Sequence, residues 1–280
     1  MAALTHTMPR WADLCTTDFA SLDPQRTVAV LPVAATEQHG PHLPLSVDTD
    51  LVEGILDAAA SHLPKACPCY VLPTQAVGLS PEHQRFPGTL TLRPETVIQL
   101  WTDIGASVAR AGVRKMVLFN SHGGHSGIMD VVGRELRSRF ELLVYSISWF
   151  NLPLYDEEGQ DLNARFTADE HRFGIHAGQI ETSMMLALKP ELVRMEHARH
   201  FPSTSQDRAR DYPILGNGRS AKLAWQMQDY HPQGAAGNAA AADAVTGRSL
   251  VNASGRALAQ VLQEIAALPL STLIDGPHQA

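Results

Sequence analysis

Short apolar runs alternate with helical apolar patterns along the first two thirds of the chain. Four runs are rich in β-branched and other apolar residues and have the length of buried strands. They are Thr27–Val33, Cys69–Gln75, Lys115–Phe119 and Leu142–Ser148. Three further segments carry apolar residues at helical spacing, namely 51–63, Pro94–Ala111 and Ile128–Phe140. Strands alternating with helices predict parallel βαβ units, and therefore an α/β fold with a mostly parallel sheet flanked by helices.

The remaining third is less regular. Residues 151–173 are predicted as a polar, loop-like insertion, and residues 194–229 as a basic, irregular segment. Helices are predicted near Glu181–Leu188 and over Val251–Leu268, with Gly234–Asp243 as the loop before the second. At the start of the first helix, Asp50 and Glu53 resemble a capping box. No shift in composition marks a boundary, so we expect residues 1–280 to form a single domain.

Composition excludes several classes of protein. The 280 residues are 44% hydrophobic and 18% charged, and 22 Lys+Arg against 29 Asp+Glu give a formal net charge of −7. Disordered chains have low hydrophobicity and high net charge, and disulfide scaffolds have many cysteines in a short chain, whereas this chain has three. The acidic balance disfavours nucleic acid as a partner. The 13 histidines are many for a chain with so few charges.

Targeting signals are weak. The N-terminal segment does not show the basic start and apolar run of a secretory signal. No uninterrupted apolar stretch approaches the ~18 residues of a membrane span. Cys15, Cys67 and Cys69 therefore read as reduced thiols. We expect a cytoplasmic protein with no membrane partner.

Carboxylates and imidazoles follow two of the predicted strands. Glu37 and His39 come after the first strand, two residues apart, so that in extended backbone they point to the same side. Gly40 and Pro41 then allow the chain to turn and bring Asp48 back towards them. After the third strand comes the segment NSHGGH, residues 120–125. Each signal alone fits a polar loop, and the Gly pair also fits an anion-binding turn. Together they predict a site for zinc, manganese or iron at the carboxyl ends of the strands.

Four ordered motifs carry a resemblance to a known family. They are TEQHGPHLPLSVD from Thr36, GLSPEHQRFPGTL from Gly78, NSHGGH from Asn120 and HAGQIETS from His176. Together they resemble the creatininase (creatinine amidohydrolase) family over residues 28–188. The resemblance implies a compact α/β fold, a two-metal site, hydrolysis of C–N bonds in small and often cyclic amides, and commonly a hexamer.

Carried over position by position, the resemblance assigns the roles within the site. The implied metal ligands are Glu37, His39, Asp48, His122 and Glu181, with Asp48 bridging two divalent ions. Zn²⁺ and Mn²⁺ are the expected ions, with Fe²⁺ as an alternative. His176 is implied to be the catalytic acid/base that, as imidazolium, protonates the leaving nitrogen. By itself, His176 would also fit a hydrogen-bonded loop histidine.

The sequence also departs from creatininase itself. Gly124 stands where creatininase has a metal-binding Glu, so the chain is closer to the wider branch with an NGHGGN-like motif. Within that branch, Ser121, His125 and Gln179 are unusual. The residues expected to contact substrate are Ser80, Glu82, His83, Gly123, Gly124, His125 and Trp149. For His125, a supporting contact or a surface position at a helix start fits equally well, and Trp149 also fits a core aromatic. Four arginines in the irregular segments are candidates for binding a substrate carboxylate: Arg165, Arg172, Arg199 and Arg219.

Three functions are consistent with these residues. The first is a metal-dependent amidohydrolase that cleaves a C–N bond of a small cyclic amide, imide or lactam through a hydroxide bridging two ions. The second uses the same metal site for isomerisation or C–C hydrolysis of a small polyol-derived ketone. The third is a non-enzymatic metal-binding or oligomeric regulatory protein. We expect the first, with a small-molecule substrate and a homo-oligomeric, preferably hexameric, assembly.

Overall fold

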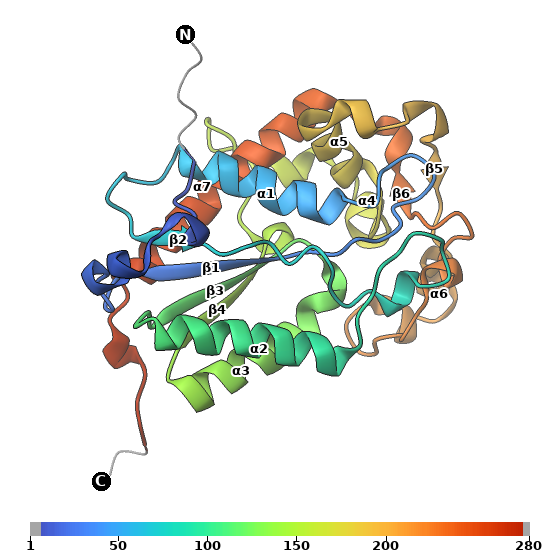
Figure 1. Cartoon of the computed structure of the whole chain (residues 1–280). Helices are drawn as coiled ribbons and strands as arrows, with labels where there is room; N and C mark the ends of the chain where they lie inside the picture. Colours follow the sequence, from blue (N-terminus) through green and yellow to red (C-terminus); the bar gives the residue numbers. More distant parts are fainter. Residues whose placement is uncertain (1–6, 277–280) are drawn as a thin grey trace.

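Four parallel strands lie at the centre of the structure, a computed structural model that describes residues 7–276 (Figure 1). They are β1 (Val28–Val33), β2 (Cys69–Val71), β3 (Lys115–Asn120) and β4 (Leu143–Ser148). Their order in the sheet is β2-β1-β3-β4, and all three pairings are parallel. Parallel neighbours need crossover connections, which the helices between the strands provide. The described residues form one compact α/β domain, as the alternating pattern predicts.

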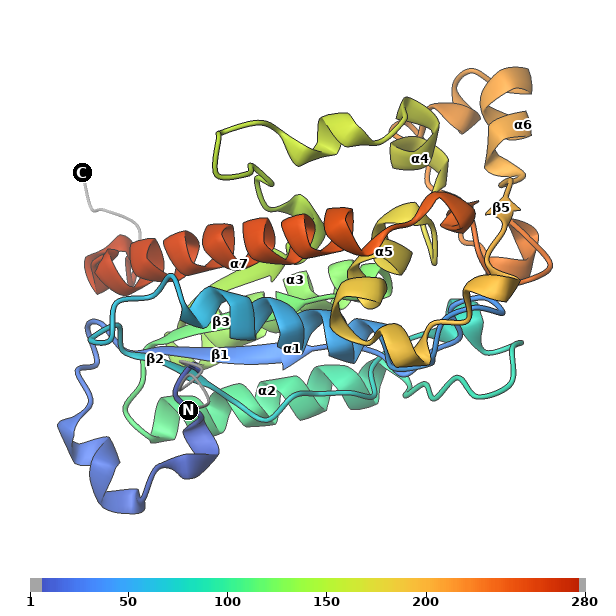
Figure 2. The same ribbon diagram turned by 90° about the horizontal axis from the view of Figure 1, so that it is seen from above.

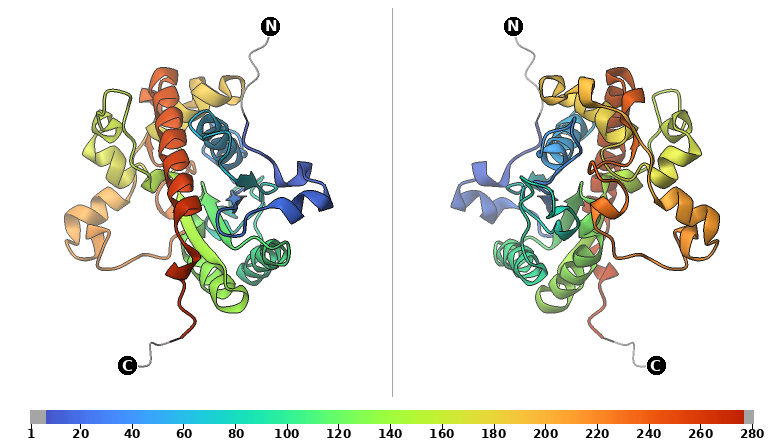
Figure 3. Two further views of the ribbon diagram at one scale, coloured as in Figure 1. Left: turned by 90° about the vertical axis from the view of Figure 1, so that its left-hand side faces the viewer. Right: turned by 90° about the vertical axis from the view of Figure 1, so that its right-hand side faces the viewer.

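Helices cover both faces of this sheet. One face carries α1 (Val47–Ala60), α5 (Gln179–Leu188) and α7 (Ala244–Ala267), and the other carries α2 (Pro94–Arg110) and α3 (Ser126–Phe140) (Figures 1 and 2). The end-on views of Figure 3 show the strands between these two helical layers. Alternate residues of β1 enter different cores, because successive side chains of a strand point to opposite faces. Val28 and Val30 pack in the core that includes α1 and α7, and Ala29 and Leu31 pack in the core that includes α2.

Two predicted helix starts are wrong. Helix α1 begins at Val47 after the N-cap Ser46, so Asp50 lies inside the first turn and is not the N-cap. The Ser46 hydroxyl donates a hydrogen bond of 2.6 Å to the Asp50 carboxylate. Helix α7 begins at Ala244 rather than at Val251, and its N-cap is Asp243. The Asp243 side chain accepts hydrogen bonds from the backbone N–H groups of Val245 and Thr246.

Small residues explain why the first turns of α7 lack an apolar pattern. A side chain at Gly247 would overlap the backbone of Ser183 in α5, and one at Gly255 would overlap Ala58 and Ala59 in α1. The three helices therefore approach one another through their backbones. The other end of α7 is held by Lys115, a fully buried residue at the start of β3. Its ammonium group donates to the carbonyl oxygens of Ile265, Ala266 and Leu268.

The two segments predicted as irregular contain short elements beyond the carboxyl ends of the strands (Figures 1 and 2). Helix α4 (Ala168–Phe173) lies in the first, and the second contains α6 (Ser205–Asp211) and β5 (His200–Phe201), which pairs antiparallel with β6 (Gly237–Asn238). The prediction of a loop over 151–173 is thus wrong at its end. Arg172 donates a hydrogen bond of 2.9 Å to the carbonyl of Gly216 and so links the two segments. Within residues 7–276, no helix has the length and apolar character that a membrane crossing requires.

Candidate metal centre and cavity

The loop between β1 and α1 carries the predicted ligands Glu37 and His39, and the third, Asp48, follows it at the start of α1. It folds back on itself, because the backbone N–H of Glu37 donates to the carbonyl of Leu45 at 3.1 Å and Gly40 adopts a φ of +69° that favours glycine. This turn brings Asp48, in the first turn of α1, beside His39. The Nε2 atom of His39 lies 3.7 Å from Asp48 Oδ1 and 3.9 Å from Glu37 Oε1. All three side chains are buried.

The fourth predicted ligand, His122, follows β3. Its Nδ1 atom lies 3.2 Å from Glu37 Oε1 and 3.5 Å from Asp48 Oδ2. Asn120 fixes the backbone of this residue, since its amide donates to the carbonyl of His122 and its side-chain oxygen accepts from the N–H of the same residue. The carboxyl ends of β1 and β3 thus bring their polar residues together, as predicted.

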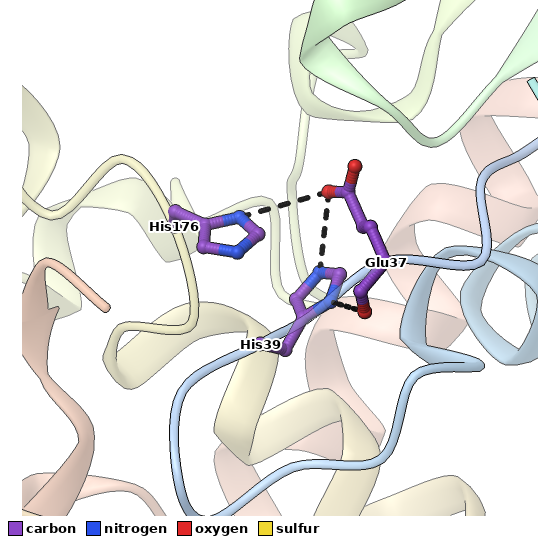
Figure 4. Close-up of side chains that lie close together, drawn as sticks. All are labelled: Glu37, His39 and His176. Carbon is purple, nitrogen blue, oxygen red and sulfur yellow. Dashed lines mark hydrogen bonds and ion pairs between the residues drawn. The ribbon is translucent and has the colours of Figure 1, made fainter. Parts of the chain in front are cut away.

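The five predicted ligands fall into two overlapping groups. Glu37, Asp48 and His122 form one group, and His39, Asp48 and Glu181 form the other, each with potential ligand atoms within 4.8 Å of one another. Asp48 belongs to both groups, as a bridging carboxylate would. Glu181 comes from the first turn of α5, far away in the sequence. A third group joins Glu37 and His39 to His176, and Figure 4 shows these three side chains pointing toward one another.

Three atoms in this cluster test whether metal ions fit. Within residues 7–276, Glu37 Oε2, His39 Nε2 and Asp48 Oδ2 are buried and have no hydrogen-bond partner. Buried polar atoms are nearly always paired, because leaving one unpaired costs about 1–3 kcal/mol. Carboxylate oxygens and imidazole nitrogens are also the donors that Zn²⁺ and Mn²⁺ take. The donor set therefore fits divalent ions of this kind.

Neighbouring carboxylates raise the pKa values of the two imidazoles in the cluster, and burial raises those of two of its carboxylates. Burial lowers the pKa of His39, but Asp48, Glu181 and Glu37 outweigh it and raise that pKa to about 9. His122 behaves in the same way, because Glu37, Glu82 and Asp48 outweigh burial and raise its pKa. Burial raises the pKa of Glu181 to about 7 and also raises that of Asp48. Protonated imidazoles thus balance the carboxylates, and a divalent ion bound by these residues would replace their protons.

His176 lies beside the cluster, and its pKa is shifted in the opposite direction to those of His39 and His122. Burial lowers the pKa of its imidazole, and the neighbouring His39 and His83 lower it further. The imidazole is therefore neutral at neutral pH. Its Nδ1 atom lies 3.9 Å from Glu37 Oε1, and its backbone pairs with Ala236. A neutral imidazole accepts a proton before it can donate one, which refines the expected role of an imidazolium donor.

A cavity of about 790 Å³ opens above the cluster. Glu37, Asp48, His122, His176 and Glu181 line it from within. Its apolar walls are formed by side chains from helices α5 and α7 and from the loops around them, namely Trp149, Phe150, Leu154, Ile175, Ile180 and Leu250. The extended segment 222–226 forms another wall. The candidate centre is therefore both buried and accessible to a ligand.

Five of the seven predicted substrate contacts line this cavity: Glu82, His83, Gly123, Gly124 and Trp149. Ser80 and His125 are fully buried behind it. His125 accepts a hydrogen bond of 3.1 Å from the backbone N–H of Leu79 and lies 3.1 Å from the side-chain oxygen of Asn120. It therefore supports the loop that carries His122, and neither the predicted substrate contact nor a surface position describes it. The lining residues include Lys222 but none of the four candidate arginines.

Ser80 and Glu82 both approach the far edge of the His122 ring. The Nε2 atom of His122 lies 3.0 Å from the carbonyl of Leu79, 3.2 Å from Glu82 Oε1 and 3.4 Å from Ser80 Oγ. A Cβ at position 124 would overlap both Glu82 Oε1 and His122 Nε2. Gly124 thus leaves room for Glu82 at the place where creatininase has a side chain of its own.

Sequence reasoning missed Gln38 and Glu170. Gln38 is buried and stands between the two predicted ligands Glu37 and His39 in the sequence, and its side-chain amide contacts His83 and His176. The Glu170 carboxylate is buried, lines the cavity and accepts hydrogen bonds from the N–H groups of Gln179 and Asn238, at 2.6 and 2.8 Å. It joins α4, α5 and β6 around the loop that carries His176. The one local signal was Thr167 three residues earlier, which caps α4. Gln179, at the first position of α5, is not among the cavity-lining residues.

Comparison with known proteins agrees with this architecture. The family model described as creatinine amidohydrolase matches residues 12–262. The mycofactocin precursor peptide peptidase of Mycobacterium ulcerans is 30% identical over 87% of both chains. The creatinine amidohydrolase of Pseudomonas putida is 32% identical over 63% of this chain and 70% of its own. The 3-dehydro-scyllo-inosose hydrolase of Thermotoga maritima is 29% identical over 62% of this chain and 54% of its own.

Solved structures show the same fold. A putative creatinine amidohydrolase from Bacteroides fragilis superposes with a TM-score of 0.73 at 24% identity, over 96% of this chain and 99% of its own. The structure described as "Creatininase Mn" gives a TM-score of 0.71 at 25% identity, over 92% of this chain and 98% of its own.

The fold and the site together define a hydrolase with an α/β fold and a candidate metal centre at the carboxyl ends of its strands. The family model covers most of the chain, and the chain belongs to the creatininase family. The resemblance seen in the four motifs is thereby confirmed, and so is the prediction of an enzyme over a non-enzymatic binding protein.

Proposed function

We propose that this hydrolase cleaves the amide C–N bond of a small molecule, preferably a cyclic amide, imide or lactam, with two divalent ions bound at the cavity floor. One observation carries the proposal. Two groups of ligand atoms share Asp48, and three of the buried atoms in them have no hydrogen-bond partner among the described residues. Zn²⁺ and Mn²⁺ suit these donors, and the solved relatives include structures described as "Creatininase Mn" and as a creatininase of "Zn-Zn type".

Each group of residues has its own task in this proposal. Glu37, Asp48 and His122 would hold one ion, and His39, Asp48 and Glu181 the other. Such ions activate water and polarise a carbonyl oxygen. The apolar walls formed by Trp149, Ile175 and Ile180 exclude bulk water from the bound amide and so strengthen electrostatic interactions with it.

His176 handles the proton. Its neutral imidazole takes the proton that the attacking water loses as the new C–O bond forms. The same proton then goes to the amide nitrogen as the C–N bond breaks. Without it, the leaving group would be a strongly basic amide anion. The imidazole is neutral again at the end of the cycle, so the proton balance closes.

The cavity leaves room for substituents. About 790 Å³ falls within the range of pockets for drug-sized ligands, ~300–1,000 Å³, so a lone five- or six-membered ring would fill a small part of it. The peptidase relative of Mycobacterium ulcerans favours an amide that extends from a short peptide as one form of this substrate. The inosose hydrolase of Thermotoga maritima favours the second candidate, C–C hydrolysis or isomerisation of a polyol-derived ketone at the same centre.

The test separates these chemistries by their products. Protein stripped with a chelator is loaded with Zn²⁺ or Mn²⁺ and assayed against creatinine, hydantoin, 2-pyrrolidinone, short peptide amides and inosose ketones. Release of an amine together with a carboxylate, lost on stripping and in His176→Ala but kept in the surface variant His62→Ala, supports the proposal. Turnover of ketones alone favours the second candidate. Amide hydrolysis that is unchanged in His176→Ala contradicts the assigned role of that residue.

We also propose a homo-oligomer, preferably a hexamer. Tyr212, Ile214 and Leu215 lie next to one another and are exposed to 57%, 70% and 64%, which favours their burial against another subunit. Light scattering coupled to gel filtration measures the mass. A species of one 30.4 kDa chain at micromolar concentration contradicts this part of the proposal.

A further inference from the structure

Gln38 presents a hydrogen-bond donor to His83. The Gln38 side-chain oxygen accepts from the backbone N–H of Gly40 at 3.0 Å. A backbone N–H can only donate, so this contact fixes which end of the amide is oxygen and which is nitrogen. The amide nitrogen therefore faces Nδ1 of His83, at 2.7 Å. Because Gln38 is buried, this orientation is held by the protein interior.

This contact decides where His83 carries its proton. An Nδ1 atom that accepts from the Gln38 amide has no proton of its own, so the proton of the ring sits on Nε2. The Nε2 atom lies 3.5 Å from Glu37 Oε1, and His83 lines the cavity. Trp225 also packs edge-on against the His83 ring, with the centroids 6.3 Å apart. His83 thus points an N–H group towards the metal cluster.

His176 also carries its proton on Nε2, but in this ring the nitrogen nearest Glu37 is Nδ1. Its Nε2 atom lies 2.8 Å from the backbone carbonyl of Gln38, which can only accept, and 3.3 Å from the Gln38 amide nitrogen, which can only donate. The shorter contact makes Nε2 the donor, so Nδ1 keeps its lone pair. The His83 and His176 rings lie beside each other, with centroids 4.3 Å apart. Gln38 therefore sets both rings, one through its side chain and the other through its backbone. Two ring atoms near Glu37 Oε1 therefore have opposite roles: Nδ1 of His176 is an acceptor, and Nε2 of His83 is a donor.

We infer that His83 donates its Nε2–H to the substrate carbonyl oxygen as that oxygen becomes negatively charged, and that Gln38 is the positioning residue that holds His83 in this tautomer. The inference rests on the proposed amide hydrolysis. When the water oxygen bonds to the carbonyl carbon, the C=O electron pair moves to the oxygen, and His83 stabilises it with a hydrogen bond while keeping its proton. A neutral imidazole suits this task, since a donor aimed at the developing charge stabilises the transition state more than the substrate.

Tautomers are read directly by ¹⁵N NMR of the zinc-loaded full chain labelled at histidine. The His83 signals are identified among those of the 13 histidines by their loss in His83→Gln. We expect Nε2 of His83 to be protonated in the wild type. Gln38→Met removes the amide donor but leaves the backbone carbonyl, so the His83 signals should shift while Nε2 of His176 keeps its proton. Gln38→Glu should move the His83 proton to Nδ1. A proton on Nδ1 of His83 in the wild type, or His83 signals unchanged in both variants, overturns the inference.

Kinetics test the role of the donor. In the zinc-loaded enzyme, His83→Ala should lower kcat for amide hydrolysis by about 10²–10³-fold with a smaller change in KM. His83→Gln keeps an N–H donor and should recover part of the loss, and Gln38→Met should lower kcat without removing the ring. The exposed His197→Gln is the matched control. An unchanged kcat in His83→Ala overturns the inference but leaves the proposed function intact. If the wild type hydrolyses no amide, the proposed function fails, and the catalytic role inferred for His83 fails with it; the NMR result still decides the tautomers.

Discussion

Glu82 Oε1 lies 3.2 Å from Nε2 of His122, the ring nitrogen on the edge opposite to the one that faces the metal cluster. A carboxylate at this place orients a ligand imidazole and raises its basicity. Glu82 was expected from sequence to contact substrate, and it does line the cavity. In the proposed centre, its contact with His122 would give it a second task, which is to orient a metal ligand.

Glu82→Gln should therefore weaken metal binding. The neutral amide keeps the shape of the side chain but removes the negative charge beside His122. We expect the dissociation constant for Zn²⁺ to rise by about 10–100-fold. Competition with a chromophoric chelator measures it, and the exposed Glu95→Gln serves as the control. Equal affinities in Glu82→Gln and the wild type would assign Glu82 to substrate alone.

Substitutions of the adjacent glycines Gly123 and Gly124 form a matched pair of variants that tests the contact between Glu82 and His122. A Cβ at Gly124 would overlap Glu82 and His122, whereas one at Gly123 meets no atom within 4 Å. Gly124→Ala should displace the Glu82 carboxylate and lower zinc affinity at least as much as Glu82→Gln does. Gly123→Ala should leave zinc affinity unchanged. Titration of both variants with Zn²⁺ checks this, and equal effects at the two positions would contradict the packing seen in the structure.

Metal binding should depend on pH through His39 and Glu181. Their pKa values in the metal-free protein are about 9 and about 7, the first raised by Asp48, Glu181 and Glu37 against the effect of burial, the second raised by burial. Both groups must lose a proton to bind an ion. Affinity should therefore rise with pH up to about 9, by about tenfold per pH unit for each proton released.

Calorimetry measures these protons. Zinc titrations at pH 7 and pH 9, each in two buffers with different ionisation enthalpies, give the number of protons released per ion. We expect more protons to be released at pH 7 than at pH 9. A rise in pH has the opposite effect on the stability of the metal-free fold. His39 stabilises that fold fully below its unfolded pKa of ~6.5, and this contribution is lost as the pH rises through about 9. Proton release that is the same at both pH values would show that His39 is already neutral.

Lys115 gives a prediction for the fold rather than the site. Its buried ammonium group donates to three carbonyls at the end of α7. Lys115→Met keeps the length and apolar stem of the side chain but leaves those carbonyls without a donor. We expect the free energy of unfolding to fall by about 2–4 kcal/mol. Urea denaturation of the metal-free protein measures it against Lys65→Met on the surface, and a loss below that of the control would contradict the assignment.

Much of the fold and site was predictable because its signals are local. Buried strands such as β1 and β3 read as short apolar runs, and the polar residues that follow them meet at one edge of the sheet. The turn at Gly40 that returns Asp48 to His39 was visible for the same reason. The start of α7 was not, since its first turns pack through glycine and its apolar pattern begins only later.

The roles of residues whose partners lie far away in the sequence could not be predicted from the sequence. Gln38 acts through His83 and His176, and no local pattern indicates that its amide nitrogen points at one of them. Glu170 binds backbone groups at two distant positions, so the sequence shows only a carboxylate in a polar segment. For His125 the sequence left a substrate contact, a supporting contact and a surface position open, because its burial against Leu79 depends on the crossover between β2 and α2.

We propose that two divalent ions share Asp48, and equilibrium dialysis of the stripped chain against Zn²⁺ counts the bound ions. We predict two ions per chain in the wild type and one in Glu181→Gln, because Glu181 belongs to only one ligand group. Asp48 belongs to both groups, so Asp48→Asn should hold neither ion tightly. One ion or none per wild-type chain at saturating Zn²⁺, or two ions retained by Asp48→Asn, would contradict it.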